Sequence, residues 1–383
     1  MSTASSAAGR RHRPFFWEEF AQQADARRST WAAERGLRAL RDGLGSEPGG
    51  APAMRHLHRV ELTDSQRDGD RLPDSYRAEH AALTLYGLHQ AAGADPVHCP
   101  GVGLGTAVRS LREGVFSSRA GAAERRLLAA ASAQDLEELV QHLRGLVPLL
   151  RHAAIGLDYT RLYRDLVAWQ TPDNGRVLRA WGLQYTAPAP AAVPEAAPRD
   201  EGGGRRYWSA FVPGHPRAGA DLAALRSGGG RAAGTVPAMW PFYRTRISKP
   251  LRDKGALTRD LVAEHSALTV FGLHQQGRTT TLHVPGTTPG DACRALLTRG
   301  SGTDHTAIER RLGALLTSLD AGELAHHLRG LVPLLRRAGI GLDYDDLCRA
   351  LRYWDDPQRP QEQPRIRNRW DRDFHTDPPA PRT

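Results

Sequence analysis

The chain has 383 residues, enough for two or three domains that each bury a core. No apolar run approaches the roughly 20 residues that span a bilayer, which argues against a membrane partner. The three cysteines fit neither a disulfide framework nor a metal set, so we expect a cytoplasmic protein. The net charge is +10 and almost all of the positive charge is arginine, which predicts an anionic partner.

The first predicted domain spans residues 15–185. Residues 1–14 contain three arginines and no apolar core, so we expect a disordered basic N-terminus and not a secretory signal. The domain opens with the aromatic sequence FFWEEF, in which Trp17 is either a core residue or a docking residue for a partner, and Trp208 in the second copy has the same two alternatives. Helical sequence follows through Leu40. Further helices are predicted over residues 79–90, over residues 106–111 and around 124–127.

A strongly amphipathic helix is predicted late in this domain, where residues 141–159 read QHLRGLVPLLRHAAIGLDY. Asp135 and Glu138 have capping-box spacing at its start, and Ala153 marks its end. Asp158 then has the place of an N-cap for a last helix over residues 159–169. Pro148 is expected to kink the amphipathic helix, because it lacks a backbone donor. One face is apolar and is predicted to enter the core: Leu143, Leu146, Val147 and Leu150.

The same sequence returns 185 residues later, where residues 326–344 read HHLRGLVPLLRRAGIGLDY. No gap is needed over about residues 37–172, and a period this long indicates a duplicated domain. We therefore predict a second domain over residues 207–376, a Pro/Ala/Gly-rich linker over 186–206 and a disordered tail over 377–383. The matching helices are expected over residues 264–276, 291–297, 309–312 and 344–354. No segment alternates with period two, so the predicted fold class is all-α, with two homologous helical-bundle domains.

Candidate catalytic or metal-binding residues are few. His80, His89 and His98 recur in the second copy, but a nine-residue spacing puts the first two on opposite helix faces. We expect these histidines to pack or to form hydrogen bonds. No pair of carboxylates has the spacing of an acid/base site, and the sequence VGLG at 102–105 lacks the strand that a phosphate loop needs. The sequence therefore predicts no catalytic residue, no metal site and no cofactor.

Arginines shared by both copies are the candidate binding residues. A solvated helix face explains any single one of them. Their retention through the divergence of the two copies favours a common role, and guanidinium groups bind phosphate well. The predicted nucleic-acid-binding residues are Arg41, Arg125, Arg126, Arg144, Arg151, Arg226, Arg310, Arg311, Arg329 and Arg336.

The segments EHAALTLYGLHQ, GVGLGTAVRSL, ERRL, ELVQHLRGLVPLLR and LDYTRLYRDLVAWQ resemble the small subunit of the type I-E CRISPR surveillance complex Cascade, the CasB family. The resemblance covers nearly all of each copy, in the right order. It implies a helical bundle without catalytic activity. It also implies that two copies lie head to tail in the complex, help to hold guide RNA and target DNA, and stabilise the displaced strand through basic surfaces.

Carried onto this sequence, the family's basic positions fall on Arg41 and Arg226, on the ERR arginines and on the HLRG arginines. Two departures stand out. The family member is ordinarily one domain per chain, and the GVGLG loop is GTTPG in the second copy. A fused pair would supply both small-subunit positions, with the backbone and large subunits of Cascade as further partners.

Two other functions remain open at this stage. The chain is alternatively a helical protein-interaction scaffold whose arginines contact acidic proteins. A metal-dependent nuclease would require a carboxylate or histidine cluster, which the sequence does not reveal.

Overall fold

The structure is a computed structural model that describes residues 13–25, 31–67, 71–91, 95–113, 117–187, 205–299 and 304–376. Residues 1–12 of the predicted basic N-terminus, most of the predicted linker and the predicted tail lie outside the described residues. The chain separates into two compact units, Met1–Tyr185 and Thr186–Thr383.

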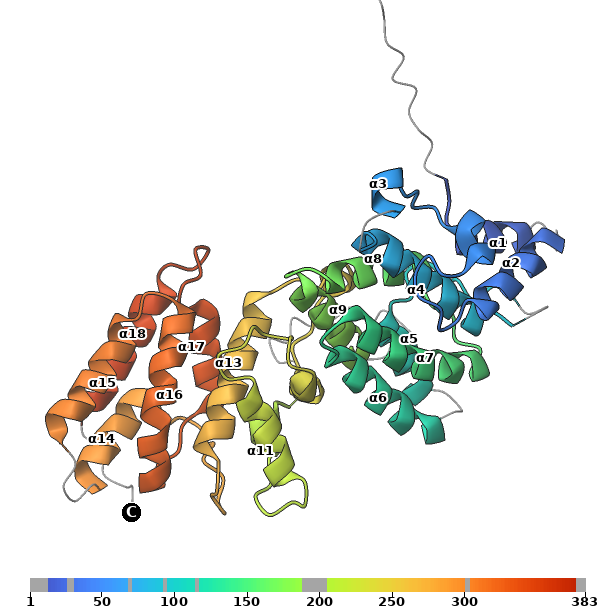
Figure 1. Cartoon of the computed structure of the whole chain (residues 1–383). Helices are drawn as coiled ribbons and strands as arrows, with labels where there is room; N and C mark the ends of the chain where they lie inside the picture. Colours follow the sequence, from blue (N-terminus) through green and yellow to red (C-terminus); the bar gives the residue numbers. More distant parts are fainter. Residues whose placement is uncertain are drawn as a thin grey trace, which may run out of the picture. The chain divides into compact units, whose positions relative to one another are not determined.

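Helices build the first unit (Figure 1). The described residues of the unit contain no β-strand, and its one isolated bridge joins His98 to Leu157. In chain order the elements are α1 (Phe16–Asp25), α2 (Trp31–Asp42), the 3-10 helix η1 (Pro52–Leu57), α3 (Asp64–Arg67), α4 (Asp74–His89), α5 (Leu104–Glu113), α6 (Ser117–Ala131), α7 (Leu136–His152), α8 (Tyr159–Trp169) and α9 (Asn174–Thr186).

The second unit repeats this order, which confirms the prediction of two homologous all-α domains. Its isolated bridge, His283 to Leu342, lies 185 residues after that of the first unit. Its elements are α10 (Tyr207–Ala210), α11 (Ala218–Ser227), the 3-10 helix η2 (Pro237–Phe242), α12 (Lys249–Asp253), α13 (Arg259–His274), α14 (Pro289–Arg299), α15 (His305–Thr317), α16 (Ala321–Ala338), α17 (Tyr344–Tyr353) and α18 (Glu362–His375).

Each unit is built around one helix that is buried on almost every side. In the first unit this helix is α4, which packs against α2, α7 and α8; in the second it is α13, which packs against α11, α16 and α17. Glycine lets the neighbouring helix approach closely: a Cβ on Gly87 would stand 2.6 Å from the Cβ of Leu40, and one on Gly272 would stand 2.7 Å from the Cβ of Leu225. α4 begins at Asp74, five residues before its predicted start, and Tyr76 and Ala78 of the added turn are buried.

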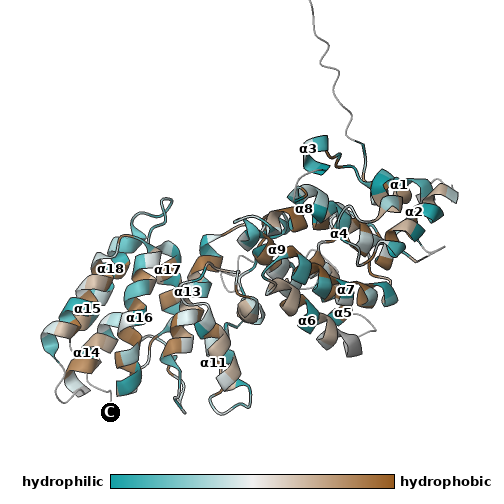
Figure 2. Ribbon diagram, viewed as in Figure 1, coloured by the Kyte–Doolittle hydropathy of each residue, from teal (hydrophilic) through white to brown (hydrophobic). Residues whose placement is uncertain are grey.

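The amphipathic helix forms as predicted in both units, as α7 and α16. Hydrophobic and hydrophilic residues alternate along α16 in Figure 2, as expected for a helix with one face in the core. Asp135 accepts a hydrogen bond from the Glu138 N–H, and Asp158 caps α8 in the same manner. α7 continues through Pro148 as a single helix.

A closing helix, α9 or α18, follows the helix that was expected to be the last, so that prediction was wrong. It packs against the N-terminal end of α5 or α14, where a Cβ on Gly105 would stand 2.0 Å from the Trp181 carbonyl oxygen. Its tryptophan stacks on that of the preceding helix, with Trp169 and Trp181 ring centroids 5.5 Å apart. The last glycine of the VGLG loop therefore serves helix packing.

The aromatic opener belongs to the core, so the docking alternative for Trp17 and Trp208 was wrong. Trp17 is fully buried and Trp208 is 1% exposed. Their indole N–H groups donate to equivalent positions, Thr160 Oγ1 and Asp345 Oδ1, each at 2.9 Å. The opener thus fastens the start of each unit to the start of α8 or α17.

Candidate nucleic-acid interface

Several of the shared arginines stabilise the fold through backbone carbonyl groups. Arg41 donates to Gly87 O at 3.0 Å and to Gln90 O at 2.6 Å, and Arg151 donates to Leu88 O at 3.0 Å. The last carbonyls of a helix have no partner within the helix, so these two guanidiniums complete the C-terminal end of α4. In the second unit Arg336 does the same for α13, while the side chain of Arg226 has no hydrogen bond or ion pair in the described chain.

Arginines at two further shared positions stabilise the packing within each unit. Arg109 is buried and donates to the Gln184 carbonyl of α9 at 3.4 Å, and its counterpart Arg294 donates to the Asp373 carbonyl of α18. Arg59 lies over the Phe15 ring, 3.8 Å from its centroid. Retention of these arginines in both copies thus has a structural explanation that requires no ligand.

The α6 and α15 arginines form a different group. Arg125, Arg126, Arg310 and Arg311 are exposed, and none pairs with a carboxylate in the described part of the chain. Arg311 donates to Ala307 O of its own helix at 3.1 Å, whereas Arg126 crosses onto α7. A Cβ on Gly145 would stand 2.8 Å from Arg126 Nε, so this guanidinium lies beside the residue that follows Arg144.

Arg144 and Arg329 occupy equivalent places in α7 and α16. Both are partly buried, and neither side chain has a hydrogen bond or an ion pair within the described residues. Burial lowers the pKa of His80 and of His265, and the charge of the nearby Arg144 or Arg329 lowers it further. The ten predicted residues therefore fall into two groups. Arg41, Arg151, Arg226 and Arg336 occupy the positions at the C-terminal end of α4 or α13, and the other six lie on α6 and α7 or on α15 and α16. Their binding of phosphate stays a prediction.

The repeated histidines form hydrogen bonds inside the units, as predicted. His89 Nδ1 lies 3.1 Å from Tyr159 OH, and His274 Nδ1 lies 2.9 Å from Tyr344 OH. His98 Nδ1 accepts from the Tyr159 N–H at 3.2 Å. Burial lowers the pKa of His89 and of His274 to about 4. These rings are neutral packing elements at neutral pH.

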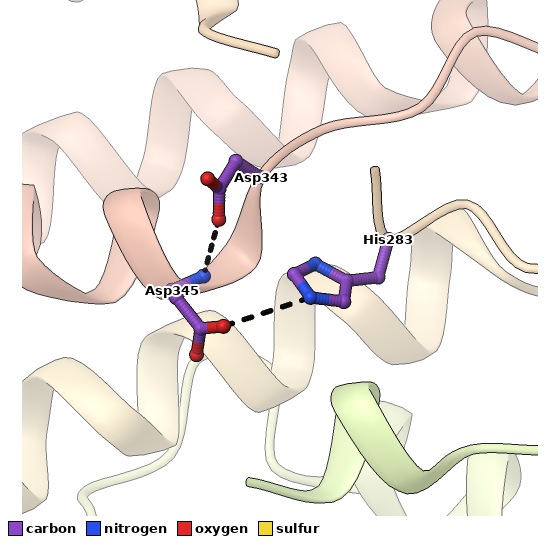
Figure 3. A group of neighbouring side chains, drawn as sticks. All are labelled: His283, Asp343 and Asp345. Carbon is purple, nitrogen blue, oxygen red and sulfur yellow. Dashed lines mark hydrogen bonds and ion pairs between the residues drawn. The ribbon is translucent and has the colours of Figure 1, made fainter. Parts of the chain in front are cut away.

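Within the residues that the structure describes, one group of side chains has a composition that can hold a metal ion: His283, Asp343 and Asp345 (Figure 3). Each has a role in the fold. Asp343 caps α17 and also accepts from the Gly286 N–H at 2.8 Å, and Asp345 accepts from Trp208. His283 Nδ1 accepts from the Tyr344 N–H at 3.2 Å, so its proton is on Nε2, which faces Asp345 Oδ2 at 3.6 Å. In the first unit Thr160 replaces Asp345. We assign no metal to this group.

A cavity of about 980 Å³ opens in the first unit, between residues 45–48, α4, the start of α7 and the end of α8. This cavity was not predicted, although the sequences of the two copies differ at the positions that line it. Positions that line it with charged or polar side chains are apolar or small in the second copy: Arg77 matches Val262, Gln134 matches Leu319 and Glu137 matches Gly322. Of the predicted residues, only Arg144 lines this cavity.

Comparison with known proteins relates both units to one family. Residues 37–185 and residues 221–375 match the family described as CRISPR-associated protein Cse2. The crystal structure of CasB from Thermobifida fusca is similar at 31% sequence identity; the match covers 42% of this chain and 86% of that chain, with a TM-score of 0.32. No curated protein matches the chain. None of the described helices is long and apolar enough to cross a membrane.

Proposed function

The chain belongs to the CRISPR-associated Cse2 family and carries the family's domain twice; from this premise we propose that it supplies both small-subunit positions of a type I-E CRISPR surveillance complex. It binds the backbones of guide RNA and target DNA, stabilises the displaced strand and cuts neither. Its protein partners are the backbone and large subunits. Two domains on one chain fix their ratio at one to one and raise the effective concentration of the second domain.

The observation that carries this proposal is which of the shared arginines have a hydrogen-bond or ion-pair partner within the protein. Arg125 and Arg310 are exposed at equivalent positions and their side chains have no hydrogen bond or ion pair in the described residues, and the side chains of their neighbours Arg126 and Arg311 have no carboxylate partner there. An exposed guanidinium without an internal role is available for a phosphate oxygen, whereas Arg41 and Arg151 already donate to carbonyl groups. Sequence-independent contacts of this kind leave specificity to base pairing.

A binding assay with a fluorescent single strand of random sequence tests the proposal. The variant Arg125→Ala, Arg126→Ala, Arg310→Ala, Arg311→Ala should bind at least tenfold more weakly than the unmodified chain at low salt. The matched control removes four arginines that pair with a carboxylate three residues away, Arg67, Arg71, Arg176 and Arg365. It makes the same change in net charge, and we expect less than a threefold loss. Equal losses in both variants, or no binding at low salt, would contradict the proposal; the second result would favour the protein-interaction scaffold.

A further inference from the structure

The excess positive charge of the second copy is concentrated in one short segment. Residues 244–254 read RTRISKPLRDK and hold five basic residues against one acidic residue. The matching residues 59–69 of the first copy read RVELTDSQRDG and hold two basic residues against three acidic ones. This segment therefore supplies five of the seven net charges by which residues 207–383 exceed residues 15–185. It also contains both lysines of the chain, Lys249 and Lys254.

The charge difference arises at three positions of the segment. Each has a basic residue in the second copy where the first copy has an acidic residue or glycine: Arg246 for Glu61, Lys249 for Asp64 and Lys254 for Gly69. The other charged residues of the segment are identical in the two copies. The same place in the domain therefore repels a polyanion in the first copy and attracts one in the second.

The three basic side chains that distinguish the second copy lie at the surface, and two of them are unpaired. Arg246, Lys249 and Lys254 are all exposed. Lys249 pairs with Asp253 at 2.8 Å, and Asp253 is the one carboxylate of the segment. The side chains of Arg246 and Lys254 have no hydrogen bond or ion pair within the residues that the structure describes. Both cations are therefore available to an anionic partner.

The backbone of this segment is fixed to the core of the second unit. The N–H groups of Arg244 and Thr245 donate to the Glu264 carboxylate of α13 at 2.9 and 2.8 Å, and Glu264 is buried. α12 then ends with Gly255 in a left-handed conformation, at φ 61°. A partner thus meets cations on a backbone that is already ordered, so binding loses little chain entropy.

We propose that residues 244–254 form a second contact surface for a nucleic-acid backbone, which the second unit has and the first unit lacks. The proposal rests on the proposed function and extends it, because α6 and α15 provide equivalent contacts whereas this segment adds contacts in one unit. A lysine holds a phosphate as a point charge and needs no fixed geometry, which suits a strand that is bound without regard to sequence. An acidic protein is the alternative occupant. The nucleic acid is favoured because the proposed function already brings a strand to this unit, at Arg310.

Binding of the fluorescent random-sequence single strand tests the proposal. Arg246→Gln with Lys249→Gln and Lys254→Gln should weaken binding at least fivefold at low salt. The matched control replaces three exposed arginines of the same unit that each lie near a carboxylate with glutamine: Arg349, Arg365 and Arg372. It makes the same change in net charge, and we expect less than a twofold loss. Equal losses in the two variants would overturn the proposal, because they would show a response to net charge alone.

The reciprocal change in the first unit should strengthen binding, which a misfolded variant cannot imitate. Glu61→Arg with Asp64→Lys places the cations of the second copy at two exposed positions of the first. We expect the affinity for the strand to increase at least threefold. Because α6 already holds the strand at the first unit in the proposed function, unchanged affinity would contradict the proposal.

A second polyanion separates nucleic acid from acidic protein. Labelled poly-L-glutamate should lose less than twofold in affinity on the triple change to glutamine. A loss as large as that of the strand would overturn the proposal, because it would show a site for acidic proteins. If the strand depends on the arginines of α6 and α15 but not on residues 244–254, this inference fails and the proposed function stands. If the strand does not bind at all, both fail.

Discussion

Ala154 is the one non-glycine residue with a positive φ in the described chain, at 53°, and it follows the C-cap of α7. The second unit has Gly339 at this position, with φ at 66°. In this left-handed conformation the Cβ of an L-residue clashes with its own backbone, and glycine avoids the clash because it has no Cβ. The end of α7 is therefore strained at Ala154, and the equivalent end of α16 is not strained at Gly339.

Ala154→Gly is therefore expected to raise the free energy of unfolding of the first unit by about 1 kcal/mol. The reciprocal Gly339→Ala should lower stability by at least as much, because the new Cβ would also meet Arg278 Nη2 at 2.9 Å. Urea denaturation followed by circular dichroism measures both. A decrease in stability for Ala154→Gly would contradict the argument.

Buried histidines make the fold sensitive to acid. The pKa of His274 is lowered to about 4 by burial, against an ordinary value near 6.5, so this ring stays neutral in the fold while the unfolded chain takes up a proton. The stabilising contribution is present above pH 6.5 and is lost as the pH falls from 6.5 towards 4. Lowering the pH from 7 to 5 should cost about 1–2 kcal/mol for each such histidine.

The titration of His274 followed by NMR measures this directly. We expect a midpoint below pH 5 for His274. A His274 midpoint near 6.5 would show that the ring is solvated and that acid sensitivity has another origin. Asp165 acts in the opposite direction, since burial raises its pKa to about 6.

At the scale of elements, the closing helix depends on glycine at the start of α5 and α14. A Cβ on Gly290 would stand 1.9 Å from the Trp370 carbonyl oxygen, and backbone atoms cannot turn aside as a side chain can. Gly290→Ala should therefore destabilise the second unit by about 3 kcal/mol through displacement of α18. The control Gly313→Ala, in α15 where nothing lies within 4 Å, should be neutral or slightly stabilising. Thermal denaturation separates the two, and equal melting temperatures would contradict this packing.

Local signals in the sequence predicted some elements well and others not at all. The caps of α7, α8, α16 and α17 were predicted because a cap depends only on an aspartate and the first three residues of the helix that follows it. The closing helices were missed because Pro172 and Pro357 follow the helices that were expected to be last and favour a helix end before them, whereas a new helix begins a few residues beyond each. α9 is held in place by the stack of Trp181 on Trp169 and by the close approach of the Trp181 carbonyl to Gly105, and the second contact joins segments about 75 residues apart. No local pattern encodes such contacts.

The repeat predicted the shared arginines as residues of the candidate site. Sequence alone cannot distinguish Arg41, whose side chain donates to two carbonyls at the end of α4, from Arg125, whose side chain has no hydrogen bond or ion pair within the described residues. The cavity escaped prediction because it arises from differences between the copies, at Arg77 and Val262 for example, and not from the residues that they share.

At the scale of the whole molecule, duplication gives one chain two similar domains with different net charge. Residues 15–185 hold 21 basic and 21 acidic residues, and residues 207–383 hold 25 and 18. The exposed arginine pairs of α6 and α15 are nevertheless equivalent. We therefore expect both units to contribute phosphate contacts of the same kind, with the second unit attracting a polyanion more strongly at long range.

The salt dependence of single-strand binding tests this central claim most directly. Each phosphate contact contributes about 0.7 to the slope of log affinity against log salt for a single strand. Arg125→Ala with Arg126→Ala should reduce the slope by about 1.4, Arg310→Ala with Arg311→Ala by the same amount, and the combined variant by about twice that. A slope that none of the variants changes, or that only one pair changes, would contradict two equivalent units that each hold the backbone of a nucleic acid.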